Sequence, residues 1–573
     1  METESEISKL LFQDAGNFMT QETLGAYLLN QLSQKGIEHI FGIPGDYILR
    51  FDKLIEKHPS IKFINTTREN TAGYMADAYA RFKGLGVACI TYGVGINIVN
   101  AISQAYVESS PLVVISGAPS QAELSKEVRL HHLFNKSLQD HIETTQFEIF
   151  EHITVAQALL NNPKHAAAEI DRVLTTCLTL KKPVYLELPR DQVDQVVFPL
   201  EAALPLPQTN VLALEEGLKE VRQILMQSQR PVIWIGHEIL RFGLSTEILG
   251  FARKYSIPIV SSLLGKTAIS EFDPLFIGVY LGGMSPTHLQ EYVNSCDCML
   301  RFGVLLNDLD TGIFTAKFPQ KYQVIATSQE FKINEHYFPK VSFKDLVKGL
   351  NLLNLTKEFS NGYRSLPMRQ EKGFISKLSD KISVDRFFTC IQSHLKPEHV
   401  LISDIGDCLF GSAELRLEFD SYLACAHFAS LSFSIPAALG VQLACPTRRP
   451  FVIVGDGAFQ MTAMELSTAV RYGLDPIIVL MNNHGYGTER PIIEGDFNDI
   501  LNWKYTEIPR VLGKGKGIRV TTETDLDKAL AEAVSTRGEF YLIEVELGKN
   551  DLSEVLQRFG RLMNQQAGEK KPT

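Results

Sequence analysis

Two residues with metal-binding side chains, Asp456 and Asn483, each follow a short apolar run that predicts a buried strand. The runs are 451–454, before a Gly-Asp-Gly turn that contains Asp456, and 476–480, before an Asn-Asn pair that ends in Asn483. A helical pattern over 461–472 separates them, so both strands of one β-α-β unit end at the same edge of a parallel sheet. Carboxylate and amide oxygens beside close-packing glycines suit Mg²⁺, which usually keeps a phosphate-bearing partner.

The elements that must position these residues form a repeating strand-turn-helix pattern. Strands are expected at 40–41, 61–65, 87–92, 111–116 and 183–188, then at 231–235, 257–260, 298–302 and 322–326, and last at 400–403, 451–454, 476–480 and 540–545. This alternation predicts an α/β fold of three doubly wound parallel-sheet domains. We place the domains at 20–190, 210–350 and 384–554, a loose leader at 1–18, linkers at 189–207 and 351–371, and a frayed tail after 567.

Bulk properties exclude several classes of function. The chain has 573 residues and a formal net charge of -10, which gives no support to nucleic-acid binding. Its eight cysteines are scattered without a Cys-x-x-Cys pair, so neither a disulfide framework nor a zinc site is indicated. We find no apolar run of about 18 residues for a membrane span and no apolar signal region at the acidic start. These features predict a cytoplasmic enzyme without a membrane partner.

A third candidate is Glu69, at the start of a predicted helix over 69–82. Taken alone, a glutamate in the first turn of a helix compensates the helix dipole. However, the helix continues as Ala-Asp-Ala-Tyr-Ala-Arg at 76–81, and 24 residues (458–481) separate the Gly-Asp-Gly turn from the Asn-Asn pair. In this combination the chain resembles the thiamine diphosphate enzymes. The resemblance covers roughly 20–554 and implies a pyrimidine-binding, a central and a diphosphate-binding domain.

The resemblance implies the cofactors thiamine diphosphate and Mg²⁺ and gives Glu69 a chemical role. A carboxyl group hydrogen-bonded to the aminopyrimidine ring promotes the imino tautomer, which activates the cofactor, while the protein supplies orientation. In the family this glutamate meets the diphosphate site across a subunit interface, so at least a homodimer is implied, and we expect a homotetramer. The implied metal ligands are Asp456, Asn483 and Gly485, and the implied cofactor-binding residues are Glu69, Gly406, Asp407, Leu431, Asp456, Gly457, Ala458, Asn483, Gly485 and Tyr486. Leu431 matches the bulky apolar residue that wedges the cofactor into its bent form.

Two further features resemble the 2-oxo acid decarboxylases within this family. Asp46 directly follows the first predicted strand and its glycine turn, and His131-His132 lies in a later connection. In those enzymes the aspartate and the adjacent histidines line the reactive side of the cofactor and move protons, in a pKa range useful for general acid-base catalysis. Glu489 occupies the place of a second acid. Burial beside cofactor and substrate would raise its pKa and keep it protonated near neutral pH.

The resemblance predicts non-oxidative decarboxylation of a small-molecule 2-oxo acid to an aldehyde and CO₂. The segments 404–410, 455–462 and 97–100 look most like the phenylpyruvate and indolepyruvate decarboxylases, so we expect an aromatic substrate. The acid at Glu489 departs from some phenylpyruvate enzymes and keeps pyruvate or a branched-chain 2-oxo acid as an alternative. A carboligase of the acetolactate synthase type would lack His131-His132 and commonly use FAD. A non-catalytic scaffold is disfavoured because Glu69, Asp456 and Asn483 are all retained.

Overall fold

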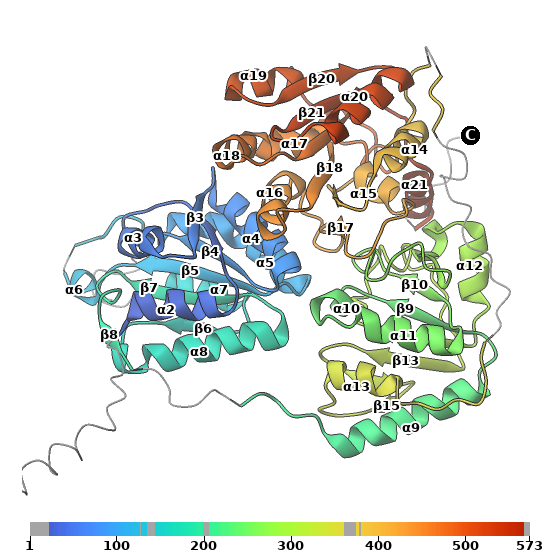
Figure 1. Cartoon of the computed structure of the whole chain (residues 1–573), viewed down its shortest axis with the longest axis horizontal. Coiled ribbons are helices and arrows are strands. Elements are labelled where there is room, and N and C mark those ends of the chain that lie inside the picture. Colours follow the sequence, from blue (N-terminus) through green and yellow to red (C-terminus); the bar gives the residue numbers. More distant parts are fainter. Residues whose placement is uncertain are drawn as a thin grey trace, which may run out of the picture.

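The computed structural model describes residues 22–126, 128–134, 144–198, 205–359, 374–377 and 380–566. The expected leader, the expected tail, and parts of both expected linkers lie outside these residues. The described residues form three large sheets flanked by helices, drawn blue to teal, green to yellow, and orange to red in Figure 1, and one two-stranded sheet. Within the described ranges, no helix combines the length and the apolar character that crossing a membrane requires.

The N-terminal sheet is parallel throughout, in the order β3-β2-β4-β5-β7-β6. Its strands are β2 (His39–Gly42), β3 (Lys62–Asn65), β4 (Gly86–Ile90), β5 (Leu112–Ala118), β6 (Gln157–Leu159) and β7 (Val184–Pro189). Its helices are α2 (Leu24–Gln34), α3 (Leu49–Lys57), α4 (Glu69–Lys83), α5 (Val99–Val107), α6 (Gln121–Leu124), α7 (Thr145–Glu151) and α8 (Pro163–Leu180). Glu69 opens α4, as expected. The expected linker is partly ordered, because β8 (Val196–Val197) pairs antiparallel with β1 (Glu22–Thr23).

The central sheet departs from the expected parallel arrangement at one edge. Its order is β11-β10-β9-β12-β13-β14-β15, and the last two strands run antiparallel to their neighbours. The strands are β9 (Pro231–Ile235), β10 (Ile259–Ser261), β11 (Phe276–Val279), β12 (Cys298–Phe302), β13 (Tyr322–Ala326), β14 (Phe331–Ile333) and β15 (His336–Tyr337). The four residues 327–330 join β13 to β14 through a turn closed by a hydrogen bond from Thr327 N to Glu330 O (2.8 Å). Such a short connection cannot make a parallel crossover, so the strand must return antiparallel.

Over residues 205–359, five helices accompany the central sheet. The described residues also include two short 3₁₀ turns, one beside the N-terminal sheet and one beside the central sheet. The helices are α9 (Val211–Gln227), α10 (Glu238–Arg241), α11 (Ser245–Tyr255), α12 (Thr287–Asn294) and α13 (Phe343–Leu350). The 3₁₀ turns are η1 (Val94–Ile98), which precedes α5, and η2 (Gly282–Met284), which precedes α12. The chain therefore enters α5 through a 3₁₀ turn.

The C-terminal sheet is parallel, in the order β17-β16-β18-β19-β21-β20. Its strands are β16 (His399–Ser403), β17 (Tyr422–Leu423), β18 (Arg449–Gly455), β19 (Ile477–Asn482), β20 (Lys516–Val520) and β21 (Tyr541–Glu546). Its helices are α14 (Val384–His394), α15 (Asp407–Ser412), α16 (Ser434–Ala444), α17 (Asp456–Thr462), α18 (Leu466–Tyr472), α19 (Ile508–Leu512), α20 (Glu523–Ser535) and α21 (Glu554–Gln566), with 3₁₀ turns η3 (Ala463–Glu465), η4 (Asp496–Asn498) and η5 (Tyr505–Glu507).

The helix after β18 begins earlier than the periodicity predicts. Instead of a separate turn, Asp456 is already the first residue of α17, and η3 interrupts the helical segment before α18. The Asp456 carboxylate accepts a hydrogen bond from Gly457 N (2.9 Å). Because the side chain satisfies a main-chain donor of the first helical turn, the chain passes from strand to helix without intervening residues.

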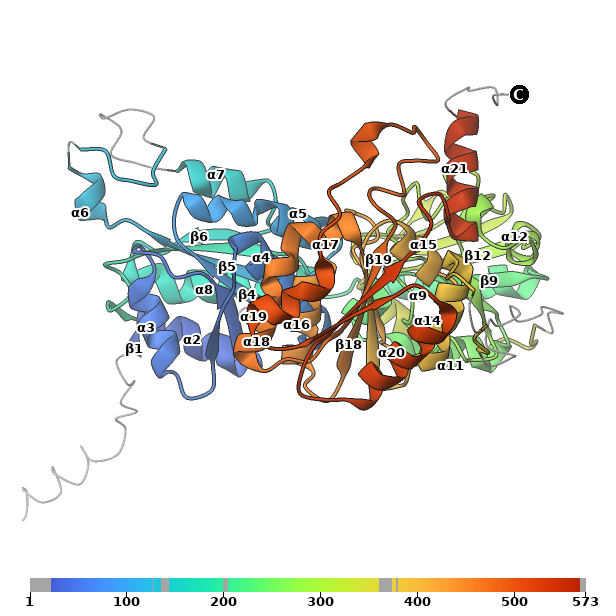
Figure 2. The same cartoon turned by 90° about the horizontal axis from the view of Figure 1, so that it is seen from above.

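Helices α4 and α16 hold the N-terminal and C-terminal sheets together, and they lie side by side in both Figure 1 and Figure 2. Gly440 permits this approach, since a Cβ atom there would lie 2.3 Å from Met75 O. Near the end of α4, Arg81 donates to the buried carboxylates of Asp77 and Glu108, each at 2.8 Å. Glu108 also accepts hydrogen bonds from the main-chain N–H groups of residues 427 and 428 in the C-terminal part. Helix packing and this buried hydrogen-bond network therefore join the two sheets within one chain.

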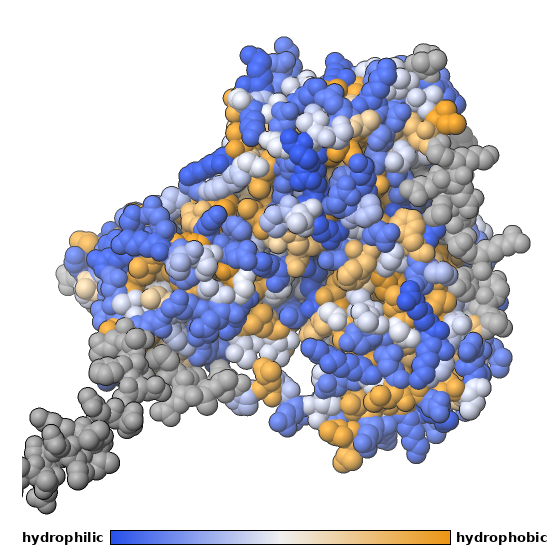
Figure 3. Space-filling view, viewed as in Figure 1, coloured by the Kyte–Doolittle hydropathy of each residue, from blue (hydrophilic) through white to orange (hydrophobic). Residues whose placement is uncertain are grey.

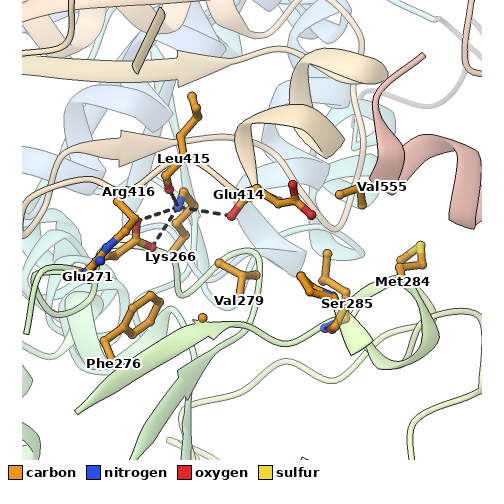
Figure 4. A pocket seen from close by; sticks show the side chains of 14 residues that line it. Lys266, Glu271, Phe276, Val279, Met284, Ser285, Glu414, Leu415, Arg416 and Val555 are labelled. Carbon is orange, nitrogen blue, oxygen red and sulfur yellow. Dashed lines mark hydrogen bonds and ion pairs between the residues drawn. The ribbon is translucent and has the colours of Figure 1, made fainter. Parts of the chain in front are cut away.

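A second buried ion pair fixes the central part of the chain to the loop after α15 (Figure 4). Lys266 Nζ donates to both carboxylate oxygens of Glu271 at 2.9 and 2.7 Å, and to Leu415 O at 2.6 Å. Glu271 also accepts a hydrogen bond from Leu417 N at 3.0 Å. Burial lowers the pKa of Lys266 and raises the pKa of Glu271, while each partner's charge opposes these shifts. Both charged groups are thus satisfied without water.

Candidate active site

The side chains of Asp456 and Asn483 meet at the carboxyl ends of β18 and β19, which pair in parallel. One end of the Asn483 amide lies 2.9 Å from Gly485 O and 3.3 Å from a carboxylate oxygen of Asp456, and its NH2 group donates to both oxygens when it is turned toward them. The other Asp456 oxygen accepts a hydrogen bond from Gly485 N at 3.0 Å. When a cation binds here, the same amide can turn its oxygen inward and form a cluster of three oxygens with Asp456 and the main chain of Gly485. The donor set of carboxylate, amide and main-chain oxygens fits Mg²⁺.

Burial makes this oxygen cluster sensitive to charge. Asp456 is fully buried and Asn483 nearly so. Desolvation raises the pKa of Asp456 to about 6, although hydrogen bonds from Gly457 and Gly485 oppose the shift. A divalent cation at this place would offset the cost of burying the carboxylate.

Glycines are required around the oxygen cluster by close contacts. At Gly485, which has φ +141°, a Cβ atom would lie 2.0 Å from Asn498 O. At Gly457 a Cβ atom would lie 2.7 Å from the ring of Tyr486. The predicted cofactor-binding residues Gly457 and Tyr486 are therefore packed against each other, whereas Gly485 packs against Asn498. Asn482 points elsewhere, since its amide donates to Glu544 at 2.8 Å.

The loop after β16 contains Gly406 and Asp407, the two residues predicted to contact the diphosphate. Gly406 has φ +92°, a left-handed conformation that suits glycine, and it precedes the first residue of α15. The Asp407 carboxylate accepts a hydrogen bond from Ser553 N at 2.9 Å, just before α21. Because a carboxylate repels a phosphate, a diphosphate contact from this loop would have to use main-chain groups. Ala458 is buried in α17, whereas the apolar Leu431 is 38% exposed.

The residues expected to move protons come together at the carboxyl edge of the N-terminal sheet. His131 Nε2 lies 3.2 Å from Asp46 Oδ2, and both side chains are exposed to solvent. The His131 and His132 rings are 4.5 Å apart between centroids, and Tyr47 stacks against His131 at 5.5 Å. One carboxylate oxygen of Asp46 and one ring nitrogen from each of His131 and His132 all lie within 4.8 Å of one another. Residues 85 positions apart in the sequence thus form one cluster.

One neighbour of this cluster, an arginine, was missed by sequence reasoning. Arg190, directly after β7, lies 3.8 Å from Asp46 Oδ2 and 5.2 Å above the Tyr47 ring. Its guanidinium also donates to Glu123 on α6 at 2.9 Å. A lone arginine after a strand carries no sequence signal for this contact.

Glu69 and Glu489 are the remaining acids of the prediction. Glu69 Oε2 accepts a hydrogen bond from Asn97 Nδ2 at 3.0 Å and stays partly exposed. Glu489 is exposed in the described part of this single chain, so the burial that the sequence argument assigns to it is not formed there. The adjacent Arg490 is buried and donates to Glu494 and Asp499, each at 2.6 Å.

Comparison with protein families defines the class of protein to which this fold and site belong. Residues 22–147 match the N-terminal thiamine pyrophosphate binding domain of thiamine pyrophosphate enzymes. Residues 218–348 match their central domain, and residues 404–545 match their C-terminal thiamine pyrophosphate binding domain. The three matches follow the three sheets in order. The protein is thus a thiamine diphosphate enzyme.

Comparison with individual relatives shows to which group of thiamine diphosphate enzymes the chain belongs. The chain is 33% identical over 545 residues to an indole-3-pyruvate decarboxylase of Azospirillum brasilense, covering 94% of this chain and 97% of that protein. It is 31% identical to an alpha-keto-acid decarboxylase of Mycolicibacterium paratuberculosis, covering 93% and 95%. The alpha-keto-acid decarboxylase of Mycobacterium tuberculosis is 30% identical, with 93% and 96% covered. The chain therefore belongs to the thiamine diphosphate-dependent 2-oxo acid decarboxylases, which are carboxy-lyases.

Proposed function

We propose that this enzyme uses thiamine diphosphate and Mg²⁺ to decarboxylate an aromatic 2-oxo acid, such as phenylpyruvate or indolepyruvate, to an aldehyde. The observation that carries the proposal is the Asp46–His131–His132 cluster at the edge of the sheet that also presents Glu69. An acetolactate synthase-type carboligase would be expected to lack these histidines. Bound thiamine diphosphate would supply the carbanion and hold the electron pair left by CO₂.

Each predicted site residue has a distinct part in this proposal. Asp456 and Asn483 would hold Mg²⁺ with the main-chain oxygen of Gly485, as the close approach of these groups suggests. Glu69 would donate a hydrogen bond to the aminopyrimidine and so favour its reactive tautomer. Asp46, His131, His132 and Glu489 would carry protons to and from the reacting carbon. Leu431 would wedge the cofactor, since its apolar side chain stands exposed beside the C-terminal sheet. Contacts from residues 406, 407, 457, 458 and 486 would complete the cofactor site.

The preference for an aromatic substrate is supported by two observations. The identity to the indole-3-pyruvate decarboxylase (33%) is higher than to the two alpha-keto-acid decarboxylases (31% and 30%). The segments 404–410 and 455–462 also look most like the phenylpyruvate and indolepyruvate enzymes. Both observations favour the aromatic branch over pyruvate.

The proposal is tested by measuring the release of aldehyde by the purified protein in the presence of thiamine diphosphate and Mg²⁺. Pyruvate, a branched-chain 2-oxo acid, phenylpyruvate and indolepyruvate are compared at equal concentration. Highest kcat/KM on the two aromatic acids supports the proposal. Highest kcat/KM on pyruvate or the branched-chain acid overturns the substrate and keeps the reaction. No aldehyde from any of the four, with cofactor bound, overturns decarboxylation in favour of the carboligase.

We also propose that the enzyme forms at least a homodimer, and that its full assembly is a homotetramer. Apolar side chains beside the oxygen cluster are exposed in the single chain, including Met461 (45%) and Met464 (57%) of the α17–η3 segment. Exposed apolar groups beside a functional site are typical of an interface with another protein. A second copy is the proposed partner because the family completes its site across subunits.

A further inference from the structure

The turn that carries Leu431 has an unfavourable backbone conformation on both sides of that residue. Ala429 has φ +59° and Ser432 has φ +74°, in the left-handed region where L-residues are destabilised by contact between Cβ and the main chain. Neither residue is a glycine, so interactions elsewhere must hold the turn in place. The result is an apolar side chain that stands 38% exposed at the tip of a rigid turn.

The group that holds this turn is the carboxylate of Asp404, directly after β16. Asp404 is fully buried. One of its oxygens accepts hydrogen bonds from Ile405 N at 2.9 Å and Ser432 N at 3.0 Å. The other accepts from Ser434 N at 3.0 Å and Ser434 Oγ at 2.6 Å. A buried charge is costly unless it is fully hydrogen-bonded, and here four donors, two of them on Ser434 and one on the strained Ser432, meet that requirement.

Other contacts hold the turn without touching the Leu431 side chain. Cys425 Sγ donates to Ser430 O at 3.2 Å, and Thr462 Oγ1 donates to Ser432 O at 3.0 Å. From the N-terminal sheet, Asn100 Nδ2 donates to Ser430 Oγ at 3.1 Å. The main chain beside Leu431 is thus held by Cys425, Thr462 and Asp404, and the Ser430 side chain is held from α5. Among these groups only Asp404 is charged. Its hydrogen bonds reach Ser432 and Ser434, which follow Leu431 in the turn.

We infer that Asp404 is a positioning residue that sets Leu431 against the bound cofactor by holding the strained 429–434 turn. This inference rests on the proposed function, in which Leu431 wedges thiamine diphosphate. Asp404 itself would touch neither cofactor nor substrate. An asparagine at position 404 would turn its NH2 group toward hydrogen-bond donors, either the N–H groups of Ile405 and Ser432 or the N–H and hydroxyl groups of Ser434. The main-chain N–H groups on that side would lose their acceptor, and the turn would relax.

The test is a double-mutant cycle of Asp404→Asn and Leu431→Ala. Both kcat and the Kd for thiamine diphosphate with Mg²⁺, by calorimetry, are measured for the four proteins. We expect Asp404→Asn to lower kcat about 10²-fold, since a small misplacement has an effect of that size. In the Leu431→Ala background the same change should alter kcat and Kd by no more than about twofold. Equal effects in both backgrounds would overturn the inference, because Asp404 would then act independently of Leu431.

A milder variant keeps the inference testable if Asp404→Asn does not fold. Ser434→Ala removes one donor to Asp404 and leaves the charge in place, so kcat and cofactor affinity should fall less than with Asp404→Asn. The matched control is Ser412→Ala, which removes a buried hydroxyl of α15 that bonds Leu409 O, away from the turn. If the control lowers cofactor affinity as much as Ser434→Ala, the inference fails.

Different results would overturn the proposed function and the proposed role of Asp404. A wild-type protein that binds no thiamine diphosphate in the presence of Mg²⁺ would overturn the proposed function and this inference with it. A wild-type protein that binds the cofactor and releases aldehyde, while the cycle is additive, would overturn the role of Asp404 alone.

Discussion

At the scale of single residues, Glu69 is the side chain on which the proposed chemistry depends most. Its carboxylate is held by Asn97 at the start of α4 and remains accessible. We expect Glu69→Gln to lower kcat by about 10²–10⁴-fold, the range of general acid-base contributions, while the fold is kept because the amide oxygen can still accept from Asn97. Steady-state kinetics and circular dichroism check this. Glu56→Gln, on the exposed face of α3, is the control, and wild-type turnover in Glu69→Gln would contradict the assignment.

Glu489 allows a second prediction at the residue scale. Because its proposed role is to carry a proton rather than to bind the cofactor, Glu489→Gln should lower turnover more than it weakens thiamine diphosphate binding. Initial rates and calorimetric Kd values are compared in the same preparations. Glu494→Gln is the control, since that carboxylate is paired with Arg490. Unchanged rates in Glu489→Gln together with lowered rates in the control would move the acid to Glu494.

At the scale of elements, the Lys266–Glu271 pair links the central sheet to the loop after α15 (Figure 4). Lys266→Met leaves a buried carboxylate without its cation, and we expect it to lower the free energy of unfolding by about 3–5 kcal/mol. Changing Glu271→Leu as well removes that charge, so the double variant should lose less than Lys266→Met. Urea denaturation measures both. Lys332→Met removes an exposed pair on β14 and should have an effect below about 0.5 kcal/mol.

The loop after β12 carries a pH-dependent group. Burial raises the pKa of Asp310 to about 7, although a hydrogen bond from Leu263 N opposes the shift. The folded chain therefore keeps this proton to higher pH than the unfolded chain, and the stability that it contributes is present below about pH 4 and lost as the pH rises to about 7. We expect Asp310→Asn to abolish this loss, which is at most about 1.4 kcal/mol per pH unit.

Urea unfolding from pH 4 to pH 8 measures the contribution of Asp310. The control is Asp308→Asn, which removes an exposed carboxyl two residues away and should keep most of the pH dependence. An identical slope in wild type and Asp310→Asn would show that another group carries the pH dependence.

At the scale of the whole molecule, docking of the sheets through α4 and α16 leaves apolar groups of the C-terminal part exposed. The face shown in Figure 3 mixes hydrophilic residues with scattered groups of hydrophobic ones, so single exposed apolar residues elsewhere need no partner. We expect Met464→Asp to shift the sedimenting species toward the single-chain mass and to lower activity in parallel. Leu212→Asp, which changes a residue 78% exposed on α9, should do neither. A fully active single chain in the wild type would contradict the proposed assembly.

The sequence by itself determined the fold class, the cofactor family and the local candidates. β9, β12 and β13 have the expected bounds, because buried apolar runs of this length are defined by local composition alone. Asp456 and Asn483 were found because parallel strands of one unit end at one edge. The short strands β17 and β20 and the antiparallel β14–β15 edge were missed. Edge strands such as β20 are largely exposed and lack a clear apolar pattern.

Only the tertiary structure decided which distant side chains meet and which predicted groups face the site. The contact of Asp46 with His131, the bonds from Asp404 to the Leu431 turn and the Lys266–Glu271–Leu417 link each join segments that no periodicity relates. The structure also turned Asp407 toward Ser553 and left Glu489 exposed in one chain. The physical reason is the distance along the sequence over which each effect acts. Backbone preference and burial pattern act over a few residues, whereas hydrogen bonding of buried charges depends on packing between elements.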